Sequence, residues 1–267
     1  MNHWIKSSIE LANQNNYLDL LYSVYPMSVN LKRELSDSVA KDIEQYFTEK
    51  DDVKLLSILL QQDLFPIKDS YVAFLKRDKN AVLRNPNTVK RIVNILYDMG
   101  LDEVLHNITL PKETNRQMGP LFKNWIDKGE IGYKITNSHQ EILDSKDNII
   151  LNSGDQNMKD FAKTHLGYQH NKGLDFIAKV NQKYIVGEAK FLTDYGGHQN
   201  AQFNDAISTL TAKFDTEKEV ITIAILDGVV YLENNGKMYT DITTIYKDEN
   251  IISAVLLKKF LQSIDEQ

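Results

Sequence analysis

The chain of 267 residues contains no cysteine and carries a formal net charge of -6 at pH 7. The lack of cysteine excludes disulfides, cysteine zinc sites and thiolate nucleophiles, and is typical of the reducing cytoplasm. Hydrophobic residues make up 42% and charged residues 25%, and no segment approaches the roughly 18 apolar residues of a membrane span. We therefore expect a soluble cytoplasmic protein that does not hold polyanions by overall charge alone.

The first 99 residues contain no glycine, whereas all 12 glycines lie at residue 100 or later. Glycine costs about 1 kcal/mol in a helix interior, so its absence favours helices. Apolar residues recur at helical spacing, as in the segment 85–100, where we expect Asn87 to cap the N-terminus and Gly100 to follow the C-terminus. The pattern predicts a helical region over residues 1–110.

Cations concentrate within this helical region. Between residues 68 and 91 there are seven of them against two anions, Asp69 and Asp78. The cations are Lys68, Lys76, Arg77, Lys79, Arg84, Lys90 and Arg91. Two interpretations stay open, a solvated helix surface and a face that contacts phosphates.

Residues 111–267 alternate helices with strands. We expect a helix over 113–129 that Gly119 and Pro120 break or kink, then short strands and turns, then a helix over 155–166 that ends at Gly167. Two strands, 174–180 and 183–191, flank two residues and so form a tight hairpin.

After the hairpin come a glycine-containing loop, a helix over 200–214 and an apolar strand over 219–226. A turn at Asp227 and Gly228 and a further strand over 229–233 follow. This order predicts an α/β domain whose mixed sheet is covered by helices.

Three charged residues interrupt the hairpin strands, which are otherwise apolar. Pairing around Asn181 and Gln182 makes the numbers of facing residues add up to 363, so Asp175 faces Glu188. Carboxylates about 5 Å apart across a ladder are destabilising unless a cation neutralises them. Lys190 shares the face of Glu188, because alternate strand residues point the same way. Such oxygen ligands suit Mg²⁺ or Mn²⁺, and the lysine can hold or deprotonate a water and offset phosphoryl charge.

The same residues also have an ordinary interpretation, as solvent-facing charges of an amphipathic hairpin. Three observations favour the metal site. The register follows from the turn, the flanks "YIVGEAKF" are those of a buried strand, and the following loop is rich in glycine and amides.

This stretch resembles a known nuclease family. Its "GLD" and "EAK", twelve residues apart, are similar to the PD-(D/E)xK nuclease signature, with Leu174 in place of the usual proline. The segment "KGLDFIAKVNQKYIVGEAKFLTDYGGHQNAQFNDA" is similar to type II restriction endonucleases of that superfamily, and "NRQMGPLFKNW" resembles the same group more distantly.

The resemblance implies a restriction endonuclease-like mixed-sheet core over residues 111–267. The helical part is too variable in such enzymes for the resemblance to assign it, and we expect the region 1–110 to contact DNA or mediate dimerisation. It implies that Asp175, Glu188 and the main-chain carbonyl of Ala189 bind Mg²⁺, which Mn²⁺ can replace, and that Lys190 orients the attacking water. The implied activity is site-specific hydrolysis of double-stranded DNA that leaves 5′-phosphate ends, within a bacterial restriction-modification system. A two-fold homodimer would match symmetric DNA sites.

Residues for DNA contact are expected in two places. The loop after the hairpin carries four polar side chains, His198, Gln199, Asn200 and Gln202. Amides can pair with adenine edges in the major groove. Arg116 and Gln117 could clamp backbone or bases in a second place. A solvated loop with a helix N-cap explains Asn200 equally well, and His198 could be a metal ligand instead. Arg116 and Gln117 need no special role as residues of a helix surface.

Two rival functions stay open at this stage. One is a DNA repair or junction-resolving nuclease of the same fold, and the other is a DNA-binding module without catalysis. Nucleotide hydrolysis and acyl transfer lack their usual motifs, because the chain has no GxxxxGK[ST] loop and no GxSxG elbow.

Overall fold

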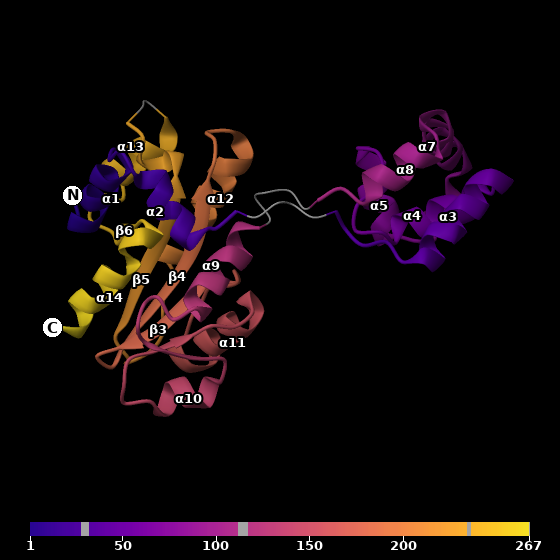
Figure 1. The fold of residues 1–267 in the computed structure, drawn as a ribbon. Helices are drawn as coiled ribbons and strands as arrows, with labels where there is room; N and C mark the ends of the chain where they lie inside the picture. The colour runs from indigo at the N-terminus through magenta and orange to yellow at the C-terminus, as the bar shows by residue number, and fades with distance from the viewer. Residues whose placement is uncertain (28–31, 112–116, 234–235, 267) are drawn as a thin grey trace. The chain divides into compact units, whose positions relative to one another are not determined.

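A computed structural model describes residues 1–27, 32–111, 117–233 and 236–266 (Figure 1). The chain divides into two compact units, a helical unit over Ser28–Glu113 and an α/β unit formed by Met1–Met27 together with Thr114–Gln267. No helix in the described ranges is long and apolar enough to cross a membrane.

This division differs from the predicted boundary at residue 110, because the first 27 residues belong to the α/β unit. They form α1 (His3–Ala12) and α2 (Tyr17–Val24). Buried Ile5 of α1 and Leu21 of α2 join apolar clusters that include residues of the central sheet. An apolar stripe predicts that a helix is amphipathic, but it does not say which partner covers the stripe.

The helical unit matches the expectation of a region without strands in its described residues. Its helices are α3 (Asp37–Glu49), α4 (Asp52–Leu60), α5 (Ser70–Arg77), α6 (Ala81–Arg84), α7 (Pro86–Met99) and α8 (Leu101–Ile108). They pack around a core of their own, which includes fully buried Leu55, Ile92 and Val104. Asn85, not the predicted Asn87, precedes α7, because Pro86 occupies the first helical position, where its missing N–H has no partner to lose.

In the described part of the α/β unit, six strands form one mixed sheet in the order β1-β2-β3-β4-β5-β6. The strands are β1 (Lys134–Thr136), β2 (Ile149–Leu151), β3 (Phe176–Val180), β4 (Lys183–Leu192), β5 (Val220–Gly228) and β6 (Ile251–Ile252). β3 pairs antiparallel with β2 and β4, whereas β1 with β2, β4 with β5, and β5 with β6 run parallel. The predicted mixed sheet is therefore confirmed.

Helices cover both faces of this sheet (Figure 1). They are α9 (Met118–Asp127), α10 (His139–Asp144), α11 (Asp155–Leu166), α12 (Gly197–Leu210), α13 (Lys237–Thr243) and α14 (Leu257–Asp265), with short 3-10 turns η2 (Val229–Tyr231) and η3 (Ala254–Leu256). Phe161 of α11 and Phe203 of α12 pack on one face of β4, and Phe122 of α9 packs on the other.

The hairpin has the predicted register. Phe176 pairs with Gly187 and Val180 with Lys183, so facing residue numbers add up to 363 as expected. Asn181 and Gln182 both have positive φ, 47° and 63°, as a two-residue type I′ turn requires. The turn therefore decides which side chains face each other across β3 and β4.

The region after Asp227 contradicts the predicted turn and strand over 229–233. β5 continues to Gly228, and η2 follows it. Asp227 is fully buried, and its carboxylate accepts hydrogen bonds from the hydroxyls of Tyr25, at 2.8 Å, and Ser253, at 2.6 Å. An Asp-Gly pair signals a solvated turn only when the aspartate faces water, and here distant residues satisfy it inside the protein.

Candidate active site

The hairpin brings Asp175, Glu188 and Lys190 together. The backbone N–H of Asp175 donates to the carbonyl of Gly187 at 3.1 Å, so the ladder extends one residue beyond β3. The Nζ atom of Lys190 lies 2.6 Å from Oε1 of Glu188 and 3.1 Å from Oδ2 of Asp175. One ammonium group therefore bridges two carboxylates that face each other across the strands.

Main-chain contacts hold this arrangement in place. The backbone N–H of Ala189 donates to Oδ2 of Asp175 at 3.0 Å. A side chain on Gly187 would place its Cβ 2.6 Å from Cγ1 of Ile223, so glycine allows β4 to lie close against β5 directly before Glu188.

Burial gives the site unusual electrostatics. Glu188 is 8% exposed, and burial, followed by the charge of Asp175, raises the pKa of its carboxyl to about 7. Burial lowers the pKa of Lys190, but the carboxylates of Asp175 and Glu188 outweigh it and raise that pKa to about 12. The lysine therefore carries its proton throughout the neutral range.

One carboxylate oxygen of Glu188 is left without a hydrogen bond to the described residues. This oxygen, Oε2, is buried. Leaving a buried carboxylate oxygen unpaired is costly unless another group binds it. The oxygen donors of Asp175 and Glu188 are those that a hard divalent cation prefers, so the site fits Mg²⁺ or Mn²⁺. In the described ranges, no three acidic or histidine side chains form a cluster that could hold a metal by themselves.

The start of α11 adds a third acid near the pair, which the sequence reasoning missed. Asp155 is among the charges that raise the pKa of Glu188. The carbonyl of Asp155 accepts a hydrogen bond from the N–H of Leu174 at 3.3 Å, and the residue forms an ion pair with Lys123 of α9. Only the capping pattern at the start of α11 marks Asp155 in the sequence, and that pattern carries no signal of function.

The residues expected to contact DNA have different surroundings. α12 begins at Gly197, so all four polar residues predicted in the loop lie in its first turns. Gln199 is 5% exposed, and its amide binds both the N–H and the hydroxyl of Thr193. Because those contacts use its amide internally, Gln199 shapes the loop.

The other polar residues of α12 are more accessible. Asn200 donates to the carbonyl of Tyr195 at 2.9 Å and so also closes the loop. His198 is exposed and Gln202 is half-buried, and their Nε2 atoms lie 3.1 Å apart. Gln117 precedes α9, and the prediction for Arg116 falls outside the described residues.

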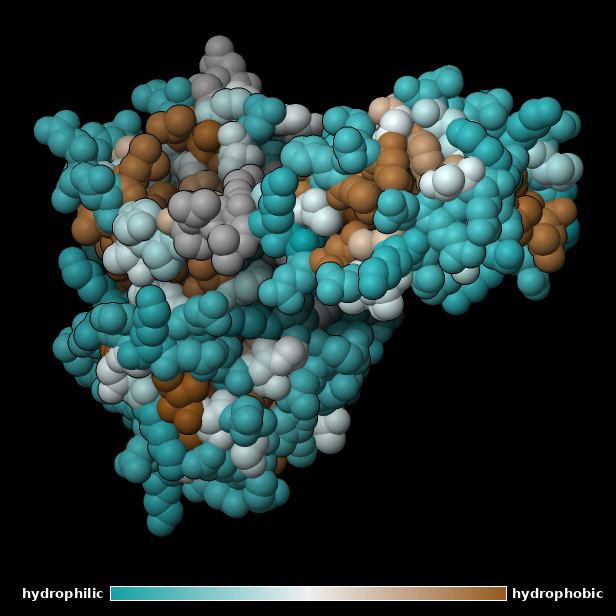
Figure 2. All heavy atoms as spheres, turned by 45° about the vertical axis from the view of Figure 1, so that its right-hand side comes forward, coloured by the Kyte–Doolittle hydropathy of each residue, from teal (hydrophilic) through white to brown (hydrophobic). Residues whose placement is uncertain are grey.

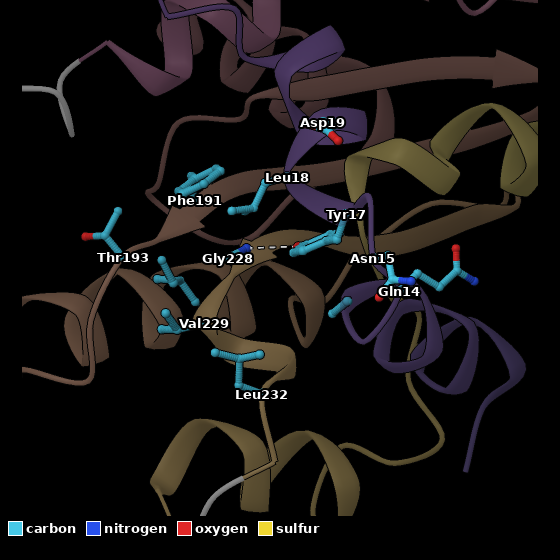
Figure 3. A pocket seen from close by; sticks show the side chains of 12 residues that line it. Gln14, Asn15, Tyr17, Leu18, Asp19, Phe191, Thr193, Gly228, Val229 and Leu232 are labelled. Atoms are coloured by element: carbon cyan, nitrogen blue, oxygen red, sulfur yellow. Dashed lines mark hydrogen bonds between the residues drawn. The ribbon is translucent and has the colours of Figure 1, made fainter.

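A cavity of about 600 Å³ opens at the C-terminal ends of β4 and β5 (Figure 3). Leu18, Phe191 and Leu232 contribute apolar walls, and the hydroxyl of Tyr17 accepts a hydrogen bond from the N–H of Gly228. None of Asp175, Glu188 and Lys190 lines it. The candidate catalytic residues therefore do not form this cavity.

The mixed α/β fold and the buried carboxylate pair are compatible with an enzyme of the restriction endonuclease type. A family model described as Tsp45I type II restriction enzyme matches residues 2–264. The chain belongs to this family and is therefore a restriction endonuclease, a hydrolase that cleaves DNA. Neither the curated proteins nor the solved structures gave a match.

Proposed function

We propose that the chain hydrolyses double-stranded DNA at a short recognition sequence with Mg²⁺ held by Asp175, Glu188 and the carbonyl of Ala189. The unpaired, buried Oε2 of Glu188 is the observation that carries the proposal. When bound, the ion supplies Lewis-acid stabilisation of a phosphoryl oxygen and lowers the pKa of water. The proposal places the chain in the PD-(D/E)xK superfamily, in which 5′-phosphate ends are the products.

The chain's own groups have separate roles in this reaction. In the metal-free site Asp175 and Glu188 raise the pKa of Lys190 to about 12, so its ammonium is a charged hydrogen-bond donor there. It orients the attacking water and offsets the negative charge that develops on the phosphate. Asp175 needs a defined orientation to bind the metal, and the hydrogen bond from the N–H of Ala189 fixes that orientation.

We further propose that the enzyme acts as a homodimer, because a two-fold protein matches a symmetric DNA site. His198, exposed at the start of α12, and Gln202, one turn later, are the proposed contacts with DNA. Among the described candidates on α12, their side chains are the ones that do not close the loop.

The test is digestion of a long viral DNA by the purified protein with Mg²⁺, with Mn²⁺ and with EDTA. We expect discrete fragments with either metal, no cutting in EDTA, and fragment ends that a ligase joins without prior phosphorylation. Random nicks, cutting confined to branched DNA, or binding without cutting would each contradict the proposal.

Two lysines on β4 allow the catalytic role of Lys190 to be tested against a matched control. Lys190→Ala should lower the cleavage rate by about a hundredfold or more, since it removes the charge beside the phosphate. Lys183→Ala removes a lysine at the start of the same strand, where it pairs with Glu219 at 3.2 Å, and should leave the rate unchanged. Equal rates for the two variants would refute the role of Lys190.

A further inference from the structure

The helical unit separates its charges along the chain. Residues 34–52 hold seven anions against two cations, whereas residues 68–91 hold seven cations against two anions. The first segment contains α3 and the start of α4, and the second contains α5, α6 and the start of α7. One part of the unit is therefore strongly basic although the unit as a whole is not.

Some basic residues in this part are paired within the unit, and others have no acidic partner among the described residues. Arg84 pairs with Asp78, Arg91 pairs with Asp69, and Lys76 donates to the carbonyls of residues 62 and 63. Four cations have no acidic partner within the described ranges and are exposed: Lys68, Arg77, Lys79 and Lys90. Solvated single lysines are common, but Arg77 of α5 and Lys90 of α7, with Lys68 before α5 and Lys79 after it, add four exposed cations without acidic partners to this part of the unit.

Two exposed aromatic rings lie among these cations. Tyr71 and Phe74 are 63% and 61% exposed, and they stand three residues apart on α5, so they share one face of the helix. The guanidinium of Arg91 on α7 lies 5.4 Å from the centre of the Tyr71 ring, which ties α7 to this face. Figure 2 shows apolar side chains at the surface of the helical unit among hydrophilic ones.

We propose that the α5–α7 face, defined as Tyr71, Phe74, Arg77 and Lys90, binds double-stranded DNA. The proposal rests on the DNA-cleaving function above and assigns the helical unit a direct part in it. Arg77 and Lys90 contact phosphates and release counterions, while the two rings pack against sugars and base edges between the phosphates. Exposed aromatics flanked by unpaired cations fit a polyanion that also offers apolar surface.

Self-association through this face is disfavoured by its charge. In a two-fold dimer the same patch of each copy meets its mate, so cations would face cations. A head-to-tail contact with the acidic α3–α4 part of another copy avoids this repulsion, but it does not close into a pair. The experiment includes this alternative as an outcome.

The test uses the full chain, a labelled duplex of random sequence and EDTA, so that binding is measured without cleavage at several salt concentrations. Arg77→Ala and Lys90→Ala should each weaken binding several-fold and lower the salt slope by about 0.9. Arg77→Lys should keep the slope, since it keeps the charge. The double substitution of Tyr71 and Phe74 by Ala should weaken binding about tenfold with the slope unchanged.

Matched controls lie on the acidic part of the same unit. Lys41→Ala removes an exposed cation from α3, and Val53→Ala trims a side chain on α4 that is 41% exposed. Both should bind DNA like the wild type. All variants replace exposed side chains, and thermal unfolding midpoints equal to that of the wild type verify that they fold.

The outcomes separate this inference from the proposed function. Variants of the face that bind and cut DNA like the wild type, or controls that lose as much affinity, overturn the inference and leave the nuclease function standing. If the face variants lose DNA binding but the wild-type protein cuts no DNA with Mg²⁺, the inference is supported and the proposed function is refuted. Variants with unchanged DNA affinity but a smaller sedimenting mass identify a contact between copies and overturn the proposal.

Discussion

The substitution Glu188→Gln tests the electrostatic account of the carboxylate pair. Glutamine has nearly the same shape as glutamate, and its amide oxygen can accept the hydrogen bond that Oε1 accepts from Lys190 at 2.6 Å. It removes the charge that burial and Asp175 disfavour. We expect the Glu188→Gln protein to cut no DNA and yet to be more stable than the wild type at pH 8 without metal.

The magnitude follows from the pKa of Glu188, which rises from 4.5 to about 7 on folding. A raised pKa means that its contribution to stability is fully present below about pH 4.5 and is lost as the pH rises through 7. The full shift corresponds to roughly 3 kcal/mol. Because Asp175 and Lys190 readjust, we expect a gain of about 1–3 kcal/mol at pH 8 and nearly none at pH 4.

The assay is thermal unfolding of both proteins in EDTA between pH 4 and pH 8, followed by a Mg²⁺ titration at pH 8. The gain should raise the unfolding midpoint of the α/β unit by roughly 2–4 °C per kcal/mol. Mg²⁺ should then stabilise the wild type and leave the Glu188→Gln protein unchanged, because only the wild type binds it tightly. Glu219→Gln, which removes an exposed charge next to β5, is the control and should shift stability by less than about 0.5 kcal/mol.

Two results would refute the reasoning. The first is a Glu188→Gln protein that is less stable than the wild type at pH 8 in EDTA, since the buried charge would then not be costly. The second is an equal stabilisation of both proteins by Mg²⁺, since the carboxylate would then not bind the ion.

Gly187→Ala should destabilise the α/β unit by about 1–3 kcal/mol, because the new Cβ lies 2.6 Å from Cγ1 of Ile223. Gly154→Ala, where a Cβ meets nothing within 4 Å, is its control in the same unfolding assay. Burial raises the pKa of Asp227 to about 7, so the wild type loses stability as the pH rises from about 4 to 7. Asp227→Asn should remove this pH dependence of the unfolding free energy, and parallel curves of stability against pH for the two proteins would contradict the account. Gln199→Ala should speed proteolytic cleavage of the loop at Thr193, and an unchanged cleavage rate would show that its amide does not hold that loop.

The amino-acid sequence determined the features that depend on neighbouring residues. A two-residue turn sets the register of the hairpin, because each step away from Asn181 and Gln182 pairs one residue with one partner. The facing of Asp175 and Glu188 was therefore predictable. The helices of residues 32–111 were predictable as well, since apolar spacing and the lack of glycine act within one or two turns.

The tertiary structure decided what depends on residues distant in the chain. The packing of residues 1–27 on the sheet, the burial of Asp227 under Tyr25 and Ser253, and the internal role of Gln199 all differ from the local pattern. Burial also creates the raised pKa of Glu188. Local patterns predict which side chains prefer water. Only the folded chain determines which polar groups are removed from water and which distant groups replace their hydrogen bonds to it.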